Sequence, residues 1–347
     1  MKLKFLRVQN FRNHEDFRCE FSPTTTLIHG MNGTGKTSLL EAVYVAYRGV
    51  SFKGVDSDIL NMKRKWYRVD LRDDSELART VIFDYRGEAK KKQFVIDDKK
   101  SVRLPVKYKK PIILFTPDDL RLIDGSPARR RKYLDTVISQ YDPQYAQLLR
   151  RYERTLLQRN KLLKQPNVTP DSLFSWNVIL SECGAYIINA RIALTEIINS
   201  QLRDYYKSIA SIDEDITATY TGHPATSRVL LAHYEVNFER DRMLGNTSAG
   251  PHRHDLAVTM RGRLASDSAS RGEARTIVVS LKYIEAALMY NYFEEYPLVL
   301  LDDVFGELDD KRQKHLLSAL KDNQLIITSA HTLNKSSLPA GTTTIAL

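Results

Sequence analysis

The chain has 347 residues, with 52 Lys and Arg against 42 Asp and Glu, which gives a net charge of +10 at pH 7. It has no run of about 18 apolar residues and no apolar signal segment, so we expect neither a membrane span nor secretion but a cytoplasmic protein. The two cysteines, Cys19 and Cys183, match no disulfide or zinc spacing. The basic excess favours a polyanionic partner such as nucleic acid.

The first strong motif is a glycine-rich loop between a strand and a helix. Residues Thr25–His29 are typical of a strand, and apolar residues recur at helical spacing from Leu39 to Tyr47. The loop between them matches G-x-x-x-x-G-K-[ST] in full, a phosphate-binding motif when a strand precedes it and a helix follows. The predicted phosphate-binding residues are Gly30, Met31, Asn32, Gly33, Thr34, Gly35, Lys36 and Thr37.

The chemistry of this loop predicts ATP and Mg²⁺ as cofactors. Glycines allow backbone N–H groups to surround a β-phosphate, and the start of the following helix adds partial positive charge. We expect Lys36 to reach the β- and γ-phosphate oxygens, which makes it one of two predicted catalytic residues. The hydroxyl of Thr37 is expected to be a Mg²⁺ ligand.

Two acids follow an apolar strand in the last quarter of the chain. Residues 297–301 are all apolar, as in a strand of a parallel sheet that is buried on both faces, and Asp302 and Asp303 come directly after them. The carboxyl ends of such strands are where open α/β sheets bind ligands. We expect Asp302 to hold Mg²⁺ and Asp303, the second predicted catalytic residue, to position or deprotonate the attacking water.

Three β-rich stretches, Trp66–Leu71, Thr80–Tyr85 and Gln93–Ile96, predict an antiparallel meander. Lysines are concentrated in and after its last strand. They either guard solvated strand edges or form a face that follows a phosphate backbone. The lysines concerned are Lys90, Lys91, Lys92, Lys99, Lys100, Lys107, Lys109 and Lys110.

The middle of the chain is predicted to be helical. Asp142-Pro143 and Thr169-Pro170 each combine an N-cap residue with proline at the first helical position. Apolar residues from Leu173 to Ile197 then step by three and four, which predicts a helical hairpin with Cys183 as a buried structural thiol. Further on, Ser270 and Gly272 precede another helical pattern, as an ordinary N-cap or as an anion site.

The order of these motifs resembles ABC-type ATPase heads, and their wide separation resembles the SMC-like branch of that family. Further stretches along nearly the whole chain are similar to the RecF family of bacterial DNA replication and recombinational repair proteins. These stretches are Asn10-Phe11-Arg12-Asn13, Leu39-Leu40-Glu41-Ala42, Phe115-Thr116-Pro117-Asp118-Asp119-Leu120, Gly250-Pro251-His252-Arg253 and Leu300-Leu301-Asp302-Asp303-Val304-Phe305. His254, Arg271, Glu273 and Thr34 depart from the usual family residues.

This resemblance implies an α/β fold: an ABC/SMC-like ATPase head with a mixed sheet, a P-loop and an inserted helical arm. The head would comprise residues 1–124 and 249–347, and the arm residues 125–248. The resemblance places Arg12 and Asn13 near the adenine, and it makes Ser270 and Gly272 a signature that contacts nucleotide held by a second copy. The switch residue is either Thr328 or His331.

The same resemblance implies an ATP-dependent homodimer that grips duplex DNA and single-strand/duplex junctions without sequence specificity. Slow ATP hydrolysis would reset this dimer, and RecR and RecO would be partners in loading RecA at the nucleoid. Two other functions stay open at this stage. One is the cytosolic ATPase subunit of an ABC transporter, and the other is an ATP-gated nuclease of the overcoming-lysogenization type.

Overall fold

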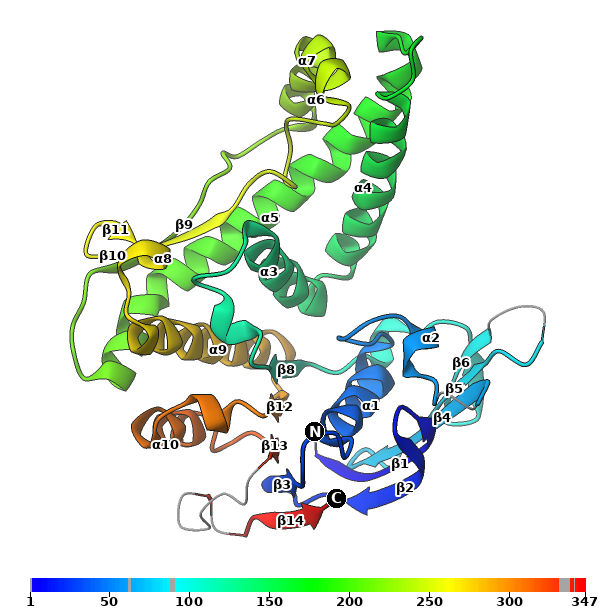
Figure 1. Ribbon diagram of the computed structural model, residues 1–347, viewed down its shortest axis with the longest axis vertical. Coiled ribbons are helices and arrows are strands. Elements are labelled where there is room, and N and C mark those ends of the chain that lie inside the picture. Colours follow the sequence, from blue (N-terminus) through cyan, green and yellow to red (C-terminus); the bar gives the residue numbers. More distant parts are fainter. Residues whose placement is uncertain (1, 62–63, 88–90, 331–337, 340) are drawn as a thin grey trace. The chain divides into compact units, whose positions relative to one another are not determined.

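A computed structural model describes residues 2–61, 64–87, 91–330, 338–339 and 341–347. It contains two compact units (Figure 1). The discontinuous unit comprises Met1–Leu120 and Glu285–Leu347, and the inserted unit is Arg121–Ile284. The first boundary lies near the expected residue 124. The second lies well beyond the expected residue 248, because the strand at 256–260 pairs with a strand at 216–220 in the inserted unit.

The strands of the discontinuous unit lie in two sheets, one antiparallel and one parallel, rather than in one mixed sheet. The antiparallel sheet includes the predicted meander, and along three of its strands buried residues recur at alternate positions, as expected for one face against the core. Its strands, in spatial order, are β2 (His14–Glu20), β1 (Leu3–Phe11), β4 (Trp66–Asp73), β5 (Ala78–Asp84), β6 (Lys91–Ile96) and β7 (Lys99–Ser101).

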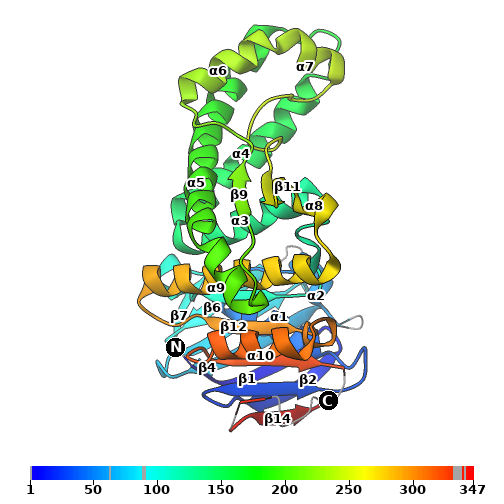
Figure 2. The ribbon, with the colours of Figure 1, turned by 90° about the vertical axis from the view of Figure 1, so that its left-hand side faces the viewer.

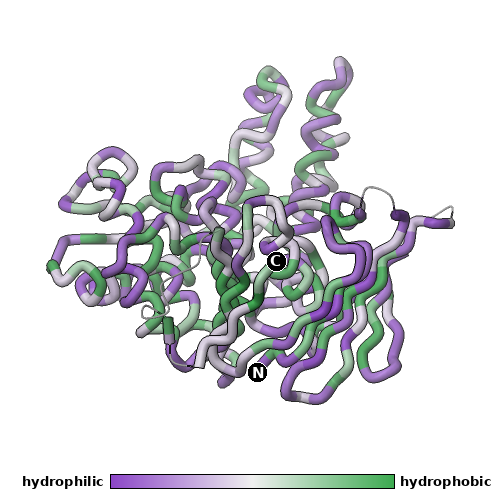
Figure 3. The backbone as a smooth tube through the Cα atoms, turned by 60° about the horizontal axis from the view of Figure 1, so that its bottom comes forward, coloured by the Kyte–Doolittle hydropathy of each residue, from purple (hydrophilic) through white to green (hydrophobic). Residues whose placement is uncertain are grey.

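The parallel sheet carries the strands that precede the glycine-rich loop and the two acids. Every residue of β12 and β13 is buried, which confirms the prediction of a strand buried on both faces. Figure 3 shows hydrophobic colour along strands inside this unit. The strands, in spatial order, are β14 (Thr343–Ala346), β3 (Thr25–His29), β13 (Leu325–Ser329), β12 (Leu298–Asp302) and β8 (Ile112–Phe115).

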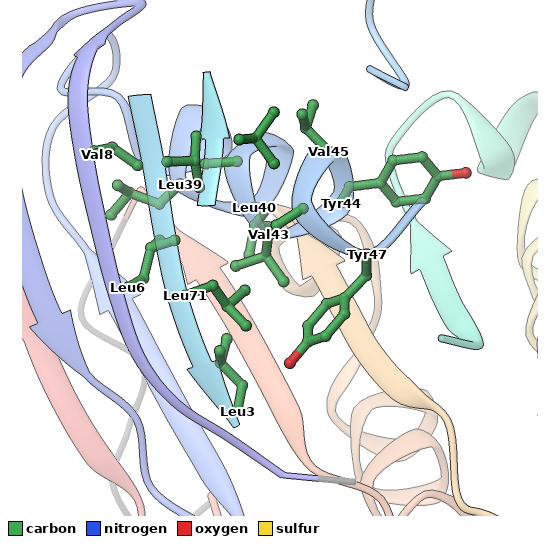
Figure 4. Packing of buried hydrophobic residues seen from close by; sticks show 14 of the residues in the cluster. Leu3, Leu6, Val8, Leu39, Leu40, Val43, Tyr44, Val45, Tyr47 and Leu71 are labelled. Atoms are coloured by element: carbon green, nitrogen blue, oxygen red, sulfur yellow. The ribbon is translucent and has the colours of Figure 1, made fainter. Parts of the chain in front are cut away.

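Helix α1 (Lys36–Arg48) packs against strands of both sheets and forms the centre of the hydrophobic core. Leu39, Leu40 and Val43 are fully buried together with Leu6 and Leu71 of the antiparallel sheet (Figure 4). The other helices of this unit are short: α2 (Asp56–Ile59), α10 (Asp310–Ala319), and the 3₁₀ turns η1 (Val106–Tyr108), η2 (Asp119–Arg121) and η3 (Phe305–Glu307). Because α1 begins directly after the loop, its burial fixes the loop to the core.

One buried amide joins the two sheets. The side chain of Gln324 accepts a hydrogen bond from Leu3 N at 2.6 Å and donates to Leu3 O and Ser22 O, both at 2.7 Å. Leu3 belongs to the antiparallel sheet, whereas Gln324 directly precedes β13 of the parallel sheet. A buried amide must find partners for its polar atoms, and here those partners come from both sheets.

The inserted unit is built around the predicted helical hairpin (Figure 2). Asp142 and Thr169 cap its two long helices through their side chains, as the sequence predicts. Cys183 is buried in the seam, and burial raises the pKa of its thiol. The helices of this unit are α3 (Pro127–Tyr141), α4 (Pro143–Leu162), α5 (Pro170–Ala210), α6 (Ser227–Val236), α7 (Phe238–Leu244), α8 (Ala265–Ser268) and α9 (Arg271–Phe293), which crosses into the other unit.

A small antiparallel sheet lies beside these helices and was not expected from the sequence. Its strands are β9 (Ile216–Tyr220), β10 (Leu256–Met260) and β11 (Arg263–Leu264). Strand β9 also contacts α5. The inserted unit is therefore α+β rather than purely helical.

Buried charges hold the inserted unit together in two networks. Arg159 donates from Nε to Asn177 Oδ1 and from Nη1 to Asp241 Oδ2 and Thr247 Oγ1, all at 2.7 Å. We call this the Arg159 network. In the second network Arg191 of α5 forms a bidentate ion pair with Asp135, with both N–O distances 2.9 Å. Burial without such partners would cost several kcal/mol for each charge.

The sequence predicts no membrane-spanning helix, but α5 is long and apolar enough to cross a membrane by length and composition alone. Half of its most apolar window is buried within the protein. It packs against α4, α6 and β9, and it carries the buried Arg191 ion pair. These contacts are those of a core helix.

Candidate nucleotide-binding site

The glycine-rich loop has a backbone that only glycine adopts easily. Gly33 and Gly35 have φ angles of 88° and 101°, in the region that side chains disfavour. At Gly30, a Cβ would lie 2.6 Å from the carbonyl oxygen of Leu347, which follows β14. At Gly33, a Cβ would meet nothing within 4 Å, so this side of the loop is open. These features fit a loop whose backbone approaches a phosphate group closely.

Lys36 is folded over the loop that precedes it. Its Nζ donates to Gly30 O at 2.7 Å and to Met31 O at 3.0 Å, and the residue is only 7% exposed. An ammonium group has three donors, so two are used here on neutral carbonyls. Since neither partner carries a charge, the contacts that Lys36 makes among the described residues do not neutralise its positive charge. The loop therefore presents a cation at the place where the motif requires one.

Oxygen atoms from three elements meet beside the loop. Thr37 of α1 donates from Oγ1 to Oδ1 of Asp302 at 2.7 Å, across a separation of 265 residues. Thr328 of β13 donates from its hydroxyl to the same oxygen at 2.9 Å. Hydroxyl and carboxylate oxygens are the ligands that Mg²⁺ prefers. The structure thus brings together the two predicted metal ligands.

Asp303 has a strained backbone at the end of β12. Its φ of 55° lies in the left-handed region, which is uncommon for a non-glycine residue and is often found at functional sites. Its backbone N–H donates to Thr328 O and Oγ1, and its Oδ1 accepts from Ala330 N at 3.2 Å. Thr328 therefore contacts both acids. Its rival as switch residue, His331, lies outside the described residues.

The turn between β1 and β2 reaches the loop. Asn13 donates from Nδ2 to Gly33 O at 2.8 Å. Arg12 donates from two nitrogens to the carboxylate of Glu41, both at 2.8 Å, and from Nη1 to Asp58 O at 2.7 Å. The bond to Glu41 raises the pKa of Arg12. The structure thus places Asn13 at the loop, whereas a contact of Arg12 with adenine stays a prediction.

Glu41 is a buried partner of Arg12 that sequence reasoning missed. It is fully buried on α1, where it accepts from Arg12 and from Ser51 Oγ. A glutamate among leucines and alanines of a core helix was a usable signal, because buried carboxylates require partners. The partners could not be named from sequence, since Arg12 is 29 residues away.

The segment around Ser270 lies in the inserted unit and begins α9. Ser270 N donates to Glu273 Oε2 at 2.7 Å, and Glu273 N donates back to Ser270 Oγ at 3.2 Å, which is a capping box. These bonds lower the pKa of Glu273, and Arg261 forms an ion pair with the same carboxylate. Gly272 contributes its carbonyl to Thr276 Oγ1 at 3.0 Å. Ser270 is exposed, so the cap leaves it accessible.

The lysine-rich region divides into paired and exposed residues. Lys92 Nζ is bound to Asp56 at 2.5 Å and to Gly49 O at 3.0 Å, and burial lowers its pKa. Lys110 pairs with Glu295 at 3.1 Å. Four others are exposed, namely Lys91, Lys99, Lys100 and Lys107. Lys90 lies outside the described residues. Lys92 and Lys110 thus have structural partners.

Comparison with known proteins gives concordant results. The family described as "AAA domain" matches residues 6–218. A protein of Ruminiclostridium cellulolyticum named "DNA replication and repair protein RecF" is 32% identical over 94% of this chain and 92% of its own length. A protein of the same name from Heliobacterium modesticaldum is 33% identical over 95% and 93%.

Solved structures give the same result. One titled "Structure of the recombination mediator protein RecF-ATP in RecFOR pathway" is 29% identical over 96% of this chain and 93% of its own, with a TM-score of 0.84. An SMC head bound to the C-winged helix domain of ScpA has a TM-score of 0.55 at 13% identity, which shows a shared fold alone. The predicted ABC/SMC-like fold is confirmed.

Proposed function

The chain belongs to the RecF family of DNA replication and repair proteins, and we propose that it is an ATP-dependent DNA-binding protein of recombinational repair and replication restart. The observation that carries this proposal is the hydrogen bond between Thr37 and Asp302, which joins the phosphate loop to the strand-end acids. Relatives named RecF match nearly the whole chain. This favours repair over a transporter ATPase subunit or an ATP-gated nuclease.

ATP and Mg²⁺ fit the residues present. The loop from Gly30 to Thr37 has open space at Gly33 and an unneutralised cation at Lys36. Thr37 and Asp302 would hold Mg²⁺, which supplies neutralisation of phosphate charge when bound. A solved relative is described as bound to ATP, which supports the same ligand here.

Hydrolysis would be slow and would act as a switch. Asp303 is held by Ala330 N through one carboxylate oxygen, so its orientation is fixed while its charge is retained. A fixed carboxylate beside the phosphate loop can orient a water for attack and accept its proton. Lys36 would stabilise charge on the phosphate oxygens. Positioning and electrostatics thus account for the proposed reaction.

Dimer formation would depend on Ser270 and Gly272 of a second copy. As a cap, Ser270 Oγ accepts an N–H, which leaves its own hydroxyl proton for a further acceptor. A γ-phosphate held by the partner copy is that acceptor in this proposal. The capping role and the signature role of Ser270 are therefore compatible.

DNA would be the substrate that this dimer grips, without sequence specificity and with a preference for duplex and single-strand/duplex junctions. The net charge of +10 supports a polyanionic partner. The RecFOR pathway named for the solved relative supports RecR and RecO as partners. A cytoplasmic, nucleoid-associated location is part of the same proposal, because DNA is the proposed substrate. Loading of RecA at gaps would be the outcome.

Binding and light scattering test this function together. Wild type should bind a fluorescent ATP analogue, dimerise with ATP and Mg²⁺, and retain DNA only then. Lys36→Ala should lose nucleotide binding, because no second cation contacts the loop carbonyls among the described contacts. Wild-type affinity in this variant would overturn the site.

A pair of variants tests the dimer. Ser270→Arg should bind nucleotide normally but fail to dimerise and to retain DNA, because a long cation enters the surface that must close on phosphate. Ser266→Arg adds the same side chain at an exposed position of the preceding helix and should behave as wild type. Loss of nucleotide binding together with dimerisation would show that Ser270 acts only as a helix cap.

A further inference from the structure

We propose that His14 is a positioning residue of the phosphate site, which holds the Gly35 carbonyl and thereby orients the donor that the loop presents to phosphate. This inference rests on the proposed nucleotide site and names a residue that the glycine-rich motif does not contain. His14 begins β2, directly after the turn that carries Arg12 and Asn13. Its side chain lies against the loop from outside the motif.

The contact itself fixes the state of the imidazole. Nε2 of His14 lies 3.1 Å from Gly35 O, and a carbonyl oxygen only accepts, so Nε2 carries the proton and donates. The residue is 8% exposed, and its ring lies 5.2 Å from that of Phe17. Burial lowers the pKa of His14, which favours the neutral ring. The loop thus receives a directional donor without an added charge.

Glycine at position 35 makes room for this ring. A Cβ on Gly35 would overlap the His14 imidazole. The requirement for glycine therefore has two physical causes here, the φ of 101° and the space that the histidine occupies. As the N-cap residue of α1, Gly35 also accepts hydrogen bonds from Ser38 N and Leu39 N through its carbonyl oxygen. The histidine joins these two donors at one carbonyl.

Planarity of the peptide carries the effect to the phosphate site. The Gly35 carbonyl and the Lys36 N–H belong to one rigid trans peptide and point in opposite directions. Holding the carbonyl from outside therefore directs the Lys36 N–H to the other side, into the loop. Asn13 holds the Gly33 carbonyl in the same way. Two peptides of the loop are thus oriented by neighbouring side chains of one turn.

The turn is rigid enough to act as a support. Asn10 and Arg12 both have φ angles of 51°, in the left-handed region, on either side of Phe11. Phe11 is fully buried, with its ring 5.3 Å from that of Tyr67. Backbone bonds from Arg12 N to Ile59 O and from Asn61 N to Asn10 O tie the turn to the α2 segment. Strain of this kind persists only where the surroundings over-determine the conformation.

Two substitutions separate positioning from packing. His14→Phe keeps a buried ring and removes the donor, whereas His14→Gln keeps an amide donor of similar reach. Affinities for ATP and for inorganic pyrophosphate would be measured by calorimetry, with thermal unfolding recorded without ligand. Glu15→Gln, an exposed neighbour on the same strand, is the matched control.

We expect His14→Phe to lower the affinities for ATP and for pyrophosphate about 10-fold each, because the variant loses one oriented hydrogen bond at the phosphate end of the site. His14→Gln should restore most of this affinity, and Glu15→Gln should match wild type. Wild-type affinity in folded His14→Phe, or equal losses in the Phe and Gln variants together with lower thermal midpoints, would overturn the inference.

Asn13→Ala provides a test that does not depend on a buried side chain. Asn13 is exposed, so removing its side chain should leave folding intact. The affinity for pyrophosphate should fall about 3-fold, because one hydrogen bond to the loop is lost. An unchanged affinity would count against a role of this turn in supporting the loop. Lys36→Ala separates the proposed nucleotide site from the proposed role of His14. If Lys36→Ala keeps ATP binding, the proposed function fails. If it loses binding while the His14 variants do not, only this inference fails.

Discussion

Lys36 of the phosphate loop and Arg159 of the inserted unit are both buried cations, but their partners differ in kind. Lys36 contacts two neutral carbonyls of the glycine-rich loop. Arg159 contacts the Asp241 carboxylate, an amide and a hydroxyl, all fixed on helices or close to them, and both members of the ion pair are fully buried. A cation whose partners are neutral can exchange them for an anionic ligand, whereas Arg159 would first have to break its buried ion pair with Asp241. The same type of charge is thus available for ligand binding in one unit and holds the structure together in the other.

The largest effect should come from breaking the Arg159 network. Arg159→Met leaves Asp241 buried without its cation, and removal of one member of a buried pair costs about 3–5 kcal/mol. Urea unfolding should show this loss. Asp241→Leu combined with Arg159→Met should recover much of it, since no unpaired charge remains. A loss of unfolding free energy below about 1 kcal/mol in Arg159→Met would show that this ion pair does not hold the inserted unit together.

Acid should weaken the inserted unit through His252. Its Nδ1 lies 2.6 Å from the Tyr152 hydroxyl, its Nε2 lies 3.0 Å from Thr247 O, and burial lowers its pKa to about 4. Well above pH 6.5 the histidine is neutral in both the folded and the unfolded state. As the pH falls from 6.5 towards 4 the unfolded chain binds the proton first, so stability is lost by roughly 3 kcal/mol.

This pH dependence can be isolated with a matched pair of variants. His252→Gln should flatten the stability profile between pH 6.5 and 4, while His233→Gln, at an exposed position on α6, should leave the slope as it is in wild type. Equal slopes in wild type and His252→Gln would show that other groups cause the acid sensitivity.

The acids of the phosphate site should behave in the opposite way to Asp241. Asp303→Asn removes a charge that has no cationic partner among its described contacts, so folding should be little affected. ATP affinity should stay within about 3-fold of wild type, but turnover should fall about 100-fold because the amide cannot accept a proton from water. Phosphate release assays measure this directly. Wild-type turnover would move the catalytic role elsewhere, with Glu307 as the next candidate.

The smallest effect is expected at the edge of the antiparallel sheet. Lys99 and Lys100 are exposed on β7, which is the edge strand. If this edge faces DNA, reversing both to Glu should weaken binding and reduce the slope of log affinity against log salt by about 0.9 for each DNA phosphate that is no longer neutralised. Lys314→Glu with Lys321→Glu changes net charge equally on another surface. An equal effect of both pairs would show that only net charge matters.

The phosphate site was predictable where local motifs specify it. The glycine-rich loop identified Thr37, and the apolar strand end identified Asp302, so their contact across 265 residues followed from two separate patterns. Apolar periodicity likewise predicted the seam of α5. The same periodicity counts only apolar positions, so it missed Arg191, whose partner Asp135 is 56 residues away on another helix. His14 was missed for a similar reason, because its role arises only where a distant turn meets Gly35.

The position of β3 between β13 and β14 has a consequence for synthesis on the ribosome. The strand before the phosphate loop pairs with residues 325–329 on one side and 343–346 on the other. At roughly 5–20 residues per second, those partners emerge roughly 15–60 s after β3 itself. The inserted unit is continuous in sequence and can be completed during this interval. We therefore expect the inserted unit to be able to fold on the nascent chain before β3 has both of its neighbouring strands, and the phosphate loop to be completed only after β13 and β14 are made.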